Sequence, residues 1–460
     1  MARVSGPLVT AASPRRARVA LVAAASAVVV LARLARRDAT ASAVAHAGLR
    51  VPDAVASLAS APAAPRNVLL VLGESLRFDD GCGDPAAPCR AAPFTDRAAP
   101  ERVRLTQMRA TASTTAISLS VILSGLPPTR TGDAIRHAPT LFDYAHAAGW
   151  DAAYWSSQPL MFTRSAEFFA ALPLARRCEG KDLGGPVDDD AGASDAALAL
   201  RVRRELPSLH EPWLALVQVT NTHFPYLTGK GSHPFQPESE SKAAEDAPAF
   251  RNHYRNAVHA QDRALGELLA WLRTTPAGRR TVVVFTADHG EAFREHGQLG
   301  HTTSLYDEEL HVPAWIDAPA GTLAPAEAEA LRAARGALTS HVDLAPTVLD
   351  LLGVLDAPAL STARARMLGE SLLRPRHAAP LVPLTNCAGI WSCGFENWGA
   401  MRGSLKLVAR DGDADWKCFD VARDPGEQRD LGAPACGDLP RAARALFGRL
   451  PSEEPAAKTP

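Results

Sequence analysis

The sequence predicts an α/β fold with a mostly parallel central sheet flanked by helices. Short apolar runs rich in β-branched residues alternate along the chain with longer amphipathic segments, which is the pattern of strand–helix–strand units. The chain has 460 residues, 47% hydrophobic and 22% charged, so it can bury a large core. Its formal net charge of −1 gives no reason to expect nucleic acid as a partner.

The first 65 residues differ in composition from the rest of the chain. Residues 1–18 form a basic segment, residues 19–35 an apolar membrane anchor or signal segment, and residues 36–65 an Ala/Pro-rich linker. The apolar run is short for a spanning helix, but flanking arginines can extend it by snorkelling. We expect a cell-membrane protein with a single N-terminal anchor and its large domain in the periplasm or outside. The alternative is secretion after signal cleavage.

The strands and helices of the large domain follow in order. Strands are predicted where short apolar runs are bounded by turn residues, at 67–73, 150–155, 213–219 and 281–285. Helices are predicted where apolar residues recur with helical spacing, at 140–149, 196–206, 254–272 and 344–352. This alternation assigns residues 66–375 to one α/β domain.

After residue 375 the pattern shortens. The runs 405–408 and 416–419 predict a hairpin in a small C-terminal α+β subdomain that covers residues 376–450. Residues 451–460 are predicted to form a tail.

Six of the seven cysteines are neighbours along the chain, in short loops rich in Gly and Pro. Such pairs favour local disulfides, which persist only in an oxidising compartment. Free thiols are the alternative, and the absence of any Cys-x-x-Cys pair argues against a cysteine zinc cluster. The neighbouring pairs are Cys82 with Cys89, Cys387 with Cys393, and Cys418 with Cys436, which leaves Cys178 alone, and the sequence by itself does not establish the connectivity.

Polar residues stand directly after two of the predicted strands. Asp288 and His289 follow the strand at 281–285, and Glu74 follows the strand at 67–73. The carboxyl ends of parallel strands carry the sites of open α/β sheets, and carboxylates with an imidazole suit zinc, manganese or similar ions. Ordinary turn chemistry would explain Asp288 alone. Several further histidines make a site the better interpretation: His223, His296, His301 and His311.

The segment 111–125 begins rich in hydroxyl groups and continues as an apolar helical pattern that ends on Gly125. A hydroxyl at a helix start lies near the positive end of the helix dipole, so it can become a nucleophile beside a divalent ion. From this segment alone, a plain Ser/Thr helix cap is an equally good interpretation.

Four motifs together resemble the sulfatase and alkaline phosphatase superfamily, in the order that the superfamily has them, and are closest to its phosphoethanolamine transferase branch. These motifs are the opening strand at 67–77, the strand end at 286–291, the helix at 340–353 and the late segment at 416–431. The resemblance covers most of the chain and implies an alkaline phosphatase-like fold, with residues 66–375 as a sulfatase-like catalytic domain.

The resemblance also implies roles for six residues. Thr115 falls at the position of the nucleophile, and Glu74, Thr115, Asp288 and His289 fall around the first metal ion. His223 matches a histidine near the substrate phosphate, and His301 a position held by histidine in the transferases. The implied cofactor is a divalent metal, with zinc expected first and manganese, calcium or magnesium as alternatives.

One departure from the family bears on the reaction. Sulfatases convert the first residue of a Cys/Ser-x-Pro-x-Arg motif into formylglycine, whereas residues 115–119 read TAISL here, and a threonine cannot give that aldehyde. We therefore expect a metal-dependent enzyme that transfers or hydrolyses a phosphoryl group through Thr115, from a phosphoethanolamine-type phosphodiester. The alternatives are a sulfate-ester hydrolase that works without formylglycine and a catalytically silent binding module. The expected substrate is a phosphodiester or sulfate ester on a lipid or glycan, and the oligomeric state is left open.

Overall fold

The computed structural model describes residues 55, 58, 66–87, 89–129, 137–159, 171–189, 191–377, 379–387, 396–410 and 413–447. The predicted basic segment, the anchor or signal segment and the tail lie outside the described residues, as does most of the predicted linker. Among the helices of the described part, none is both long enough and apolar enough to cross a membrane.

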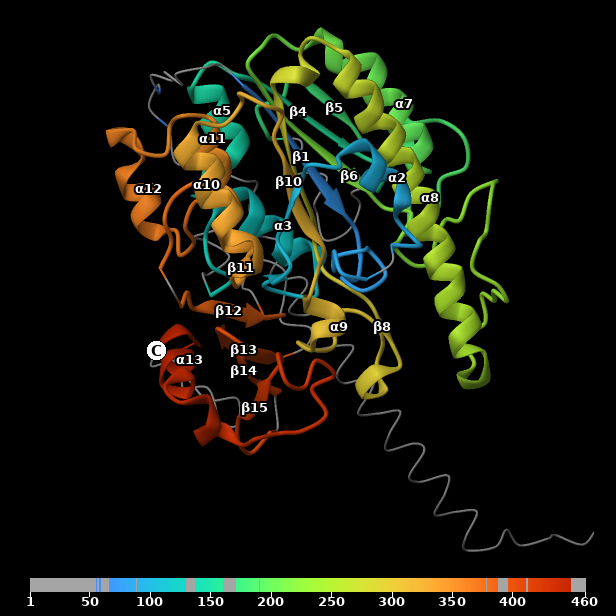
Figure 1. The fold of residues 1–460 in the computed structure, drawn as a ribbon, viewed down its shortest axis with the longest axis vertical. Coiled ribbons are helices and arrows are strands. Elements are labelled where there is room, and N and C mark those ends of the chain that lie inside the picture. Colours follow the sequence, from blue (N-terminus) through green and yellow to red (C-terminus); the bar gives the residue numbers. More distant parts are fainter. Residues whose placement is uncertain are drawn as a thin grey trace, which may run out of the picture. The chain divides into compact units, whose positions relative to one another are not determined.

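A seven-stranded sheet forms the centre of the fold (Figure 1). In spatial order its strands are β2 (Val103–Arg104), β10 (Ala314–Asp317), β7 (Thr281–Ala287), β1 (Asn67–Gly73), β6 (Trp213–Val219), β4 (Asp151–Ser156) and β5 (Arg176–Cys178). β1 is parallel to both β6 and β7, while β10 runs antiparallel to its neighbours. Every residue of β1, β6 and β7 is buried, which explains why their sequences are continuous apolar runs. The predicted mostly parallel sheet is confirmed.

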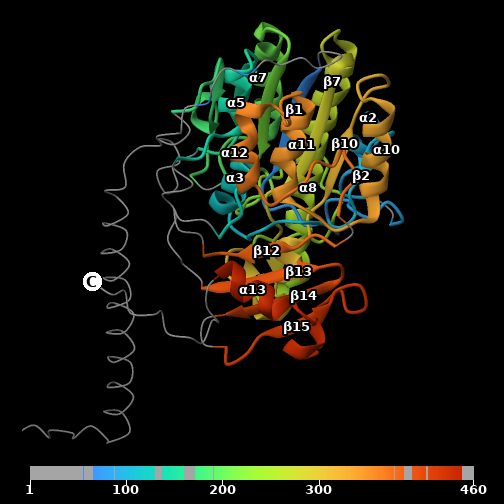
Figure 2. The same cartoon turned by 90° about the vertical axis from the view of Figure 1, so that its left-hand side faces the viewer.

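Helices cover both faces of this sheet (Figures 1 and 2). One face carries α2 (Pro93–Ala98), α7 (Asp195–Glu205) and α8 (Ala247–Thr274), and the other carries α3 (Thr115–Ser124), α5 (Leu141–Ala147), α10 (Pro325–Ala333), α11 (Leu344–Leu351) and α12 (Ser361–Arg366). The long helix α8 begins at Ala247, well before the predicted start at residue 254. Its first turn contains Pro248, which is tolerated there because the first N–H groups of a helix have no intrahelical partner.

The C-terminal residues form a second sheet, in the order β12 (Val382–Thr385), β13 (Asn397–Arg402), β14 (Leu405–Arg410) and β15 (Lys417–Asp420), together with α13 (Leu439–Phe447). The predicted hairpin is confirmed, because β14 and β15 pair antiparallel. Side chains alternate along β14: Leu407 packs with α13, whereas Val408 joins the main hydrophobic core. The small sheet therefore shares the core of the α/β domain.

Two of the predicted disulfides are present, Cys82–Cys89 and Cys418–Cys436. Cys387 is also disulfide-bonded, and its predicted partner Cys393 lies outside the described residues. Cys178, which the sequence left alone, is buried and forms no disulfide with a described cysteine.

Candidate active site

The ends of two adjacent strands meet at the candidate site. Because β1 and β7 are parallel and paired in register, with Gly73 opposite Ala287, their carboxyl ends deliver the following residues to one edge of the sheet. These residues are Glu74 after β1, and Asp288 and His289 after β7, and all three side chains are fully buried. The arrangement predicted from the strand ends is therefore the one that the fold produces.

Helix α3 adds a hydroxyl to the three ligand-type side chains. Thr115 is its first residue, and the helix ends on Gly125, whose left-handed φ of 71° favours glycine. The Thr115 Oγ1 donates a hydrogen bond of 2.6 Å to Glu74 Oε1 and lies 3.2 Å from His289 Nε2. Among the hydroxyl-bearing residues around the start of α3, it is therefore Thr115 whose hydroxyl lies against the Glu74 carboxylate.

The geometry of these residues fits a divalent cation. One ligand atom from each of Glu74, Asp288 and His289 lies within 4.8 Å of the other two. The Asp288 Oδ1 accepts hydrogen bonds from the backbone N–H groups of Ser75 and His289, at 2.9 and 2.7 Å, whereas its buried Oδ2 has no hydrogen-bond partner among the described residues. The His289 Nδ1 donates to the Gly290 carbonyl at 2.8 Å, which leaves Nε2 with its lone pair towards the carboxylates. A buried carboxylate oxygen of this kind, beside a second carboxylate, is one that a bound cation would satisfy.

The pKa shifts of these three side chains also fit a site for a cation. Burial, followed by repulsion from Asp288, raises the pKa of Glu74 to about 7. Burial likewise raises the pKa of Asp288 to about 6, and burial followed by repulsion from His301 lowers the pKa of His289 to about 4. Two buried carboxyl groups side by side are costly to ionise unless a positive charge compensates them.

The histidines His223 and His301 lie beside this group. The His301 ring is 4.4 Å from the His289 ring and 5.6 Å from the His223 ring, measured between centroids. The His301 Nδ1 donates to Glu291 Oε1 at 3.0 Å, and the His223 Nδ1 to the Phe224 carbonyl at 2.7 Å. Burial lowers the pKa of His301, but attraction to Glu291 outweighs it and brings the pKa to about 9. In both rings the bond is made through Nδ1, and no hydrogen bond to a described residue occupies Nε2.

Two other histidines that the sequence suggested have structural contacts instead. His296 stacks on Tyr306 and bonds Glu308 through Nδ1 at 2.8 Å. His311 stacks on Phe78, and its Nε2 bonds the Thr106 carbonyl at 3.0 Å. Neither bond involves a side chain of the candidate site.

Sequence reasoning missed three residues that support the site. Gln218 donates from Nε2 to Glu74 Oε2 at 2.9 Å, Glu291 holds His301, and Asn386 contacts the segments that precede Thr115 and follow His301. A glutamine inside the otherwise apolar run of β6 was a usable signal, because a buried polar side chain needs a partner. Asn386 has no such signal, since its partners are far away along the chain.

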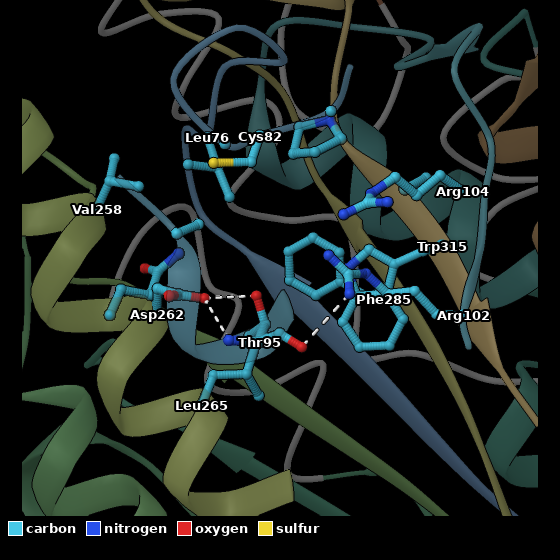
Figure 3. Close-up of a pocket in the computed structure, with 16 residues that line it drawn as sticks. Leu76, Cys82, Thr95, Arg102, Arg104, Val258, Asp262, Leu265, Phe285 and Trp315 are labelled. Carbon is cyan, nitrogen blue, oxygen red and sulfur yellow. Dashed lines mark hydrogen bonds between the residues drawn. The ribbon is translucent and has the colours of Figure 1, made fainter. Parts of the chain in front are cut away.

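A separate small cavity lies between α2, α8, β7 and β10 (Figure 3). None of the six predicted site residues lines it, and its free space of about 20 Å³ suits a single water molecule. The Asp262 carboxylate at its wall accepts hydrogen bonds from the N–H groups of Phe94 and Thr95, at 2.6 and 3.1 Å, and from the Thr95 hydroxyl. These bonds fasten α2 to α8, so we assign this cavity a structural role.

Comparisons with known proteins agree with this architecture. A family model described as Sulfatase matches residues 66–354, more than half of the chain. Arylsulfatase K from Danio rerio is 33% identical over 157 residues, which cover 32% of this chain and only 28% of that relative. The chain thus matches less than a third of the relative's length.

Solved structures share the fold. A protein in the alkaline phosphatase superfamily from Vibrio parahaemolyticus has a TM-score of 0.61 at 20% identity, covering 85% of this chain and 88% of that chain. The C-terminal periplasmic domain of phosphoethanolamine transferase EptC from Campylobacter jejuni has a TM-score of 0.54 at 17% identity, covering 68% of this chain and 94% of that chain. These likenesses confirm the predicted alkaline phosphatase-like fold.

Proposed function

The chain belongs to the sulfatase family, and from this premise we propose that it is a metal-dependent enzyme that transfers or hydrolyses a phosphoryl group of a phosphodiester. One observation carries the proposal: the Thr115 hydroxyl lies 2.6 Å from Glu74 Oε1, within the buried cluster that fits a cation. A threonine keeps its hydroxyl, which suits attack on phosphorus. We propose Thr115 as the nucleophile.

Glu74, Asp288, His289 and the Thr115 hydroxyl would hold the divalent ion, and zinc is our first choice for a set of carboxylates with one imidazole. Bound there, the ion would lower the pKa of the hydroxyl and neutralise negative charge on the substrate. Gln218 fixes Glu74 through its second oxygen, so the carboxylate is held in place from both sides.

The residues of the chain would then act in two steps. In the first, Thr115 Oγ1 attacks phosphorus, its proton passes to Glu74, and the phosphorus–oxygen bond to the leaving alcohol breaks. The leaving oxygen takes a proton from His301 Nε2, since Glu291 keeps this ring protonated by raising its pKa over the effect of burial. In the second, water or an acceptor hydroxyl gives its proton to His301 and attacks the phosphothreonine, and Thr115 recovers its proton from Glu74.

His223 has a supporting part in this scheme. Its ring is half-buried and lies 5.6 Å from the ring of His301, with Nδ1 held by the Phe224 carbonyl. We propose that its Nε2 donates to a non-bridging oxygen of the substrate, as an electrostatic stabiliser.

We also propose that the enzyme works in an oxidising compartment, in the periplasm or outside the cell, on an ester carried by a lipid or glycan. The disulfides Cys82–Cys89 and Cys418–Cys436 support this location, because such bonds persist where glutathione does not reduce them. The membrane anchor at 19–35 stays a prediction.

The test compares the purified metal-loaded chain with two variants, Thr115→Ala and Thr114→Ala. Thr114 is the matched control, because it is the neighbouring N-cap threonine and its side chain makes no cap hydrogen bond. The substrates are bis(p-nitrophenyl) phosphate, a phosphatidylethanolamine analogue and p-nitrophenyl sulfate, with intact-mass spectrometry of the protein after each incubation. We expect turnover of a phosphodiester and an adduct on Thr115 in the wild type and in Thr114→Ala, and neither in Thr115→Ala.

Other outcomes would contradict the proposal in distinct ways. Full activity in Thr115→Ala would move the nucleophile to Ser113, Thr114 or Ser118. Rapid release of p-nitrophenol from the sulfate alone would favour the sulfate-ester hydrolase. No turnover, no adduct and no bound metal would favour the binding module.

A further inference from the structure

Asn386 connects two segments of the candidate site from outside the α/β domain. It directly follows β12 in the C-terminal sheet and is only 4% exposed. Its Oδ1 accepts a hydrogen bond of 2.8 Å from the Ser113 backbone N–H. Its Nδ2 lies 2.8 Å from Ser113 Oγ and 3.0 and 3.1 Å from the carbonyl oxygens of Thr302 and Ser304. One side-chain amide thus bridges the two segments.

Each of these segments leads directly to a residue of the proposed mechanism. Ser113 lies in the segment that enters α3 just before Thr115, and Thr302 is the next residue after His301. Thr302 has a φ of 75°, a left-handed conformation that is unfavourable for a β-branched residue unless its surroundings hold it. The bond from Asn386 to the Thr302 carbonyl is one contact that holds this backbone.

The bridge requires the chemistry of an amide. Ser113 N–H needs an acceptor, whereas the Thr302 and Ser304 carbonyls need a donor, and the short side-chain amide of Asn386 offers both groups in one plane. An aspartate in the same place would keep the acceptor and lose the donor.

Asn386 is itself held rigidly by the C-terminal sheet. Its backbone N–H donates to Asn397 Oδ1 of β13 at 2.9 Å, and the neighbouring Thr385 N–H donates to the Thr111 carbonyl at 2.9 Å. The sheet is in turn packed into the main core through Val408. A shift of this sheet would therefore be passed to both segments.

We propose that Asn386 is a positioning residue that fixes Thr115 relative to His301, so that the C-terminal sheet completes the active site. The inference rests on the proposed function of these two residues. Asn386 also lies beyond residues 66–354, the segment that the family model matches.

The test uses Asn386→Ala and Asn386→Asp in the full chain, with Leu407→Ala as the matched control. Leu407 is fully buried in the same sheet but faces α13, away from the site, so its loss weakens the sheet without touching the bridge. Two measurements are made: kcat and KM with bis(p-nitrophenyl) phosphate, and hydrogen exchange of peptides that contain Ser113 or Thr302. Hydrogen exchange does not depend on turnover.

In both Asn386 variants we expect kcat to fall about 10- to 100-fold, because a misplacement near 1 Å costs that much, while KM changes little. Exchange should rise in both peptides and metal content should stay the same. Leu407→Ala should lower the melting temperature yet leave kcat and exchange in these peptides as in the wild type. If Asn386→Ala does not fold, Asn386→Asp, which keeps the size of the side chain, still tests whether the amide positions the two segments.

Wild-type kcat and exchange in Asn386→Asp would overturn the inference, as would an equal loss of kcat in Leu407→Ala. Failure of the proposed function would look different. Thr115→Ala would then be as active as the wild type, whereas the exchange result for Asn386 would still report whether the amide holds both segments.

Discussion

Replacing Lys406 by methionine should destabilise the chain, because this lysine is the centre of a buried ion-pair network between the C-terminal sheet and the α/β domain. Its Nζ lies 2.8 Å from Asp307 Oδ1 and 2.9 Å from Glu427 Oε1, and the lysine side chain is fully buried. Arg109 adds a second cation, with its Nη2 2.8 Å from Asp307 Oδ2. In the wild type, two cations thus meet two buried carboxyl groups, of which Glu427 has a pKa that burial raises to about 7.

The structure sets the size of the effect. Without Lys406, Asp307 keeps Arg109, but among the described residues the Glu427 carboxyl group keeps only the Asp307 backbone N–H, at 2.6 Å. Breaking a buried ion pair on one side costs about 3–5 kcal/mol, and the remaining Arg109 contact points to the lower end, about 3 kcal/mol. At about 2 °C per kcal/mol for a chain of this size, the melting temperature should fall by about 6 °C.

Thermal unfolding followed by circular dichroism measures this change, with Lys417→Met as the control. Lys417 lies on the neighbouring strand β15, is 38% exposed and is 3.6 Å from Asp413, so its loss should change stability by less than about 1 kcal/mol. The double variant Lys406→Met/Glu427→Gln should recover part of the loss, because it removes the uncompensated charge. If Lys406→Met melts with the wild type, or the double variant recovers nothing, the network does not stabilise the fold as argued.

Two further predictions concern the metal centre and acid stability. Asp288→Asn removes an anionic ligand, so metal content per chain, measured by inductively coupled plasma mass spectrometry, should fall; unchanged content would exclude this aspartate as a ligand. Burial lowers the pKa of His341 to about 3, so between pH 6.5 and 3 the unfolded chain binds a proton that the folded chain does not. Stability should therefore drop by about 1.4 kcal/mol per pH unit on acidification, from His341 alone. His341→Gln should flatten this slope in pH-dependent melting, and a slope equal to that of the wild type would refute the argument.

Much of the sheet could be predicted from the sequence because parallel strands buried on both faces are continuous apolar runs. The strand Trp213–Val219 matches its prediction at both ends. β10 was not predicted, since Ala314–Asp317 is only four residues long and follows a proline. β12 was also missed, because Pro383 normally argues against a strand; it is tolerated here because β12 is an edge strand, where one N–H has no partner to lose.

The residues of the candidate site also divide into those that could be predicted from the sequence and those that could not. Glu74, Asp288 and His289 could be predicted because each follows a strand within the motif that forms it. The supporting residues could not, because their partners are distant in sequence: Gln218 bonds Glu74 across 144 residues, and Asn386 bonds Ser113 across 273. The periodicity of apolar residues within one helix or strand carries no information about such distant pairs.

The predicted boundary at residue 375 stays a prediction, and the contacts of β14 bear on what it would mean. Successive residues of this strand face opposite ways, so Lys406 and Val408 point to the α/β domain while Leu407 and Ala409 pack against α13. The inward side chains supply both a buried charge for Asp307 and apolar surface for the main core. A chain cut at the boundary would expose that surface and leave Asp307 paired only with Arg109 among these charges. The C-terminal sheet therefore packs as a part of the main core, although its sequence pattern resembles that of a separate small domain.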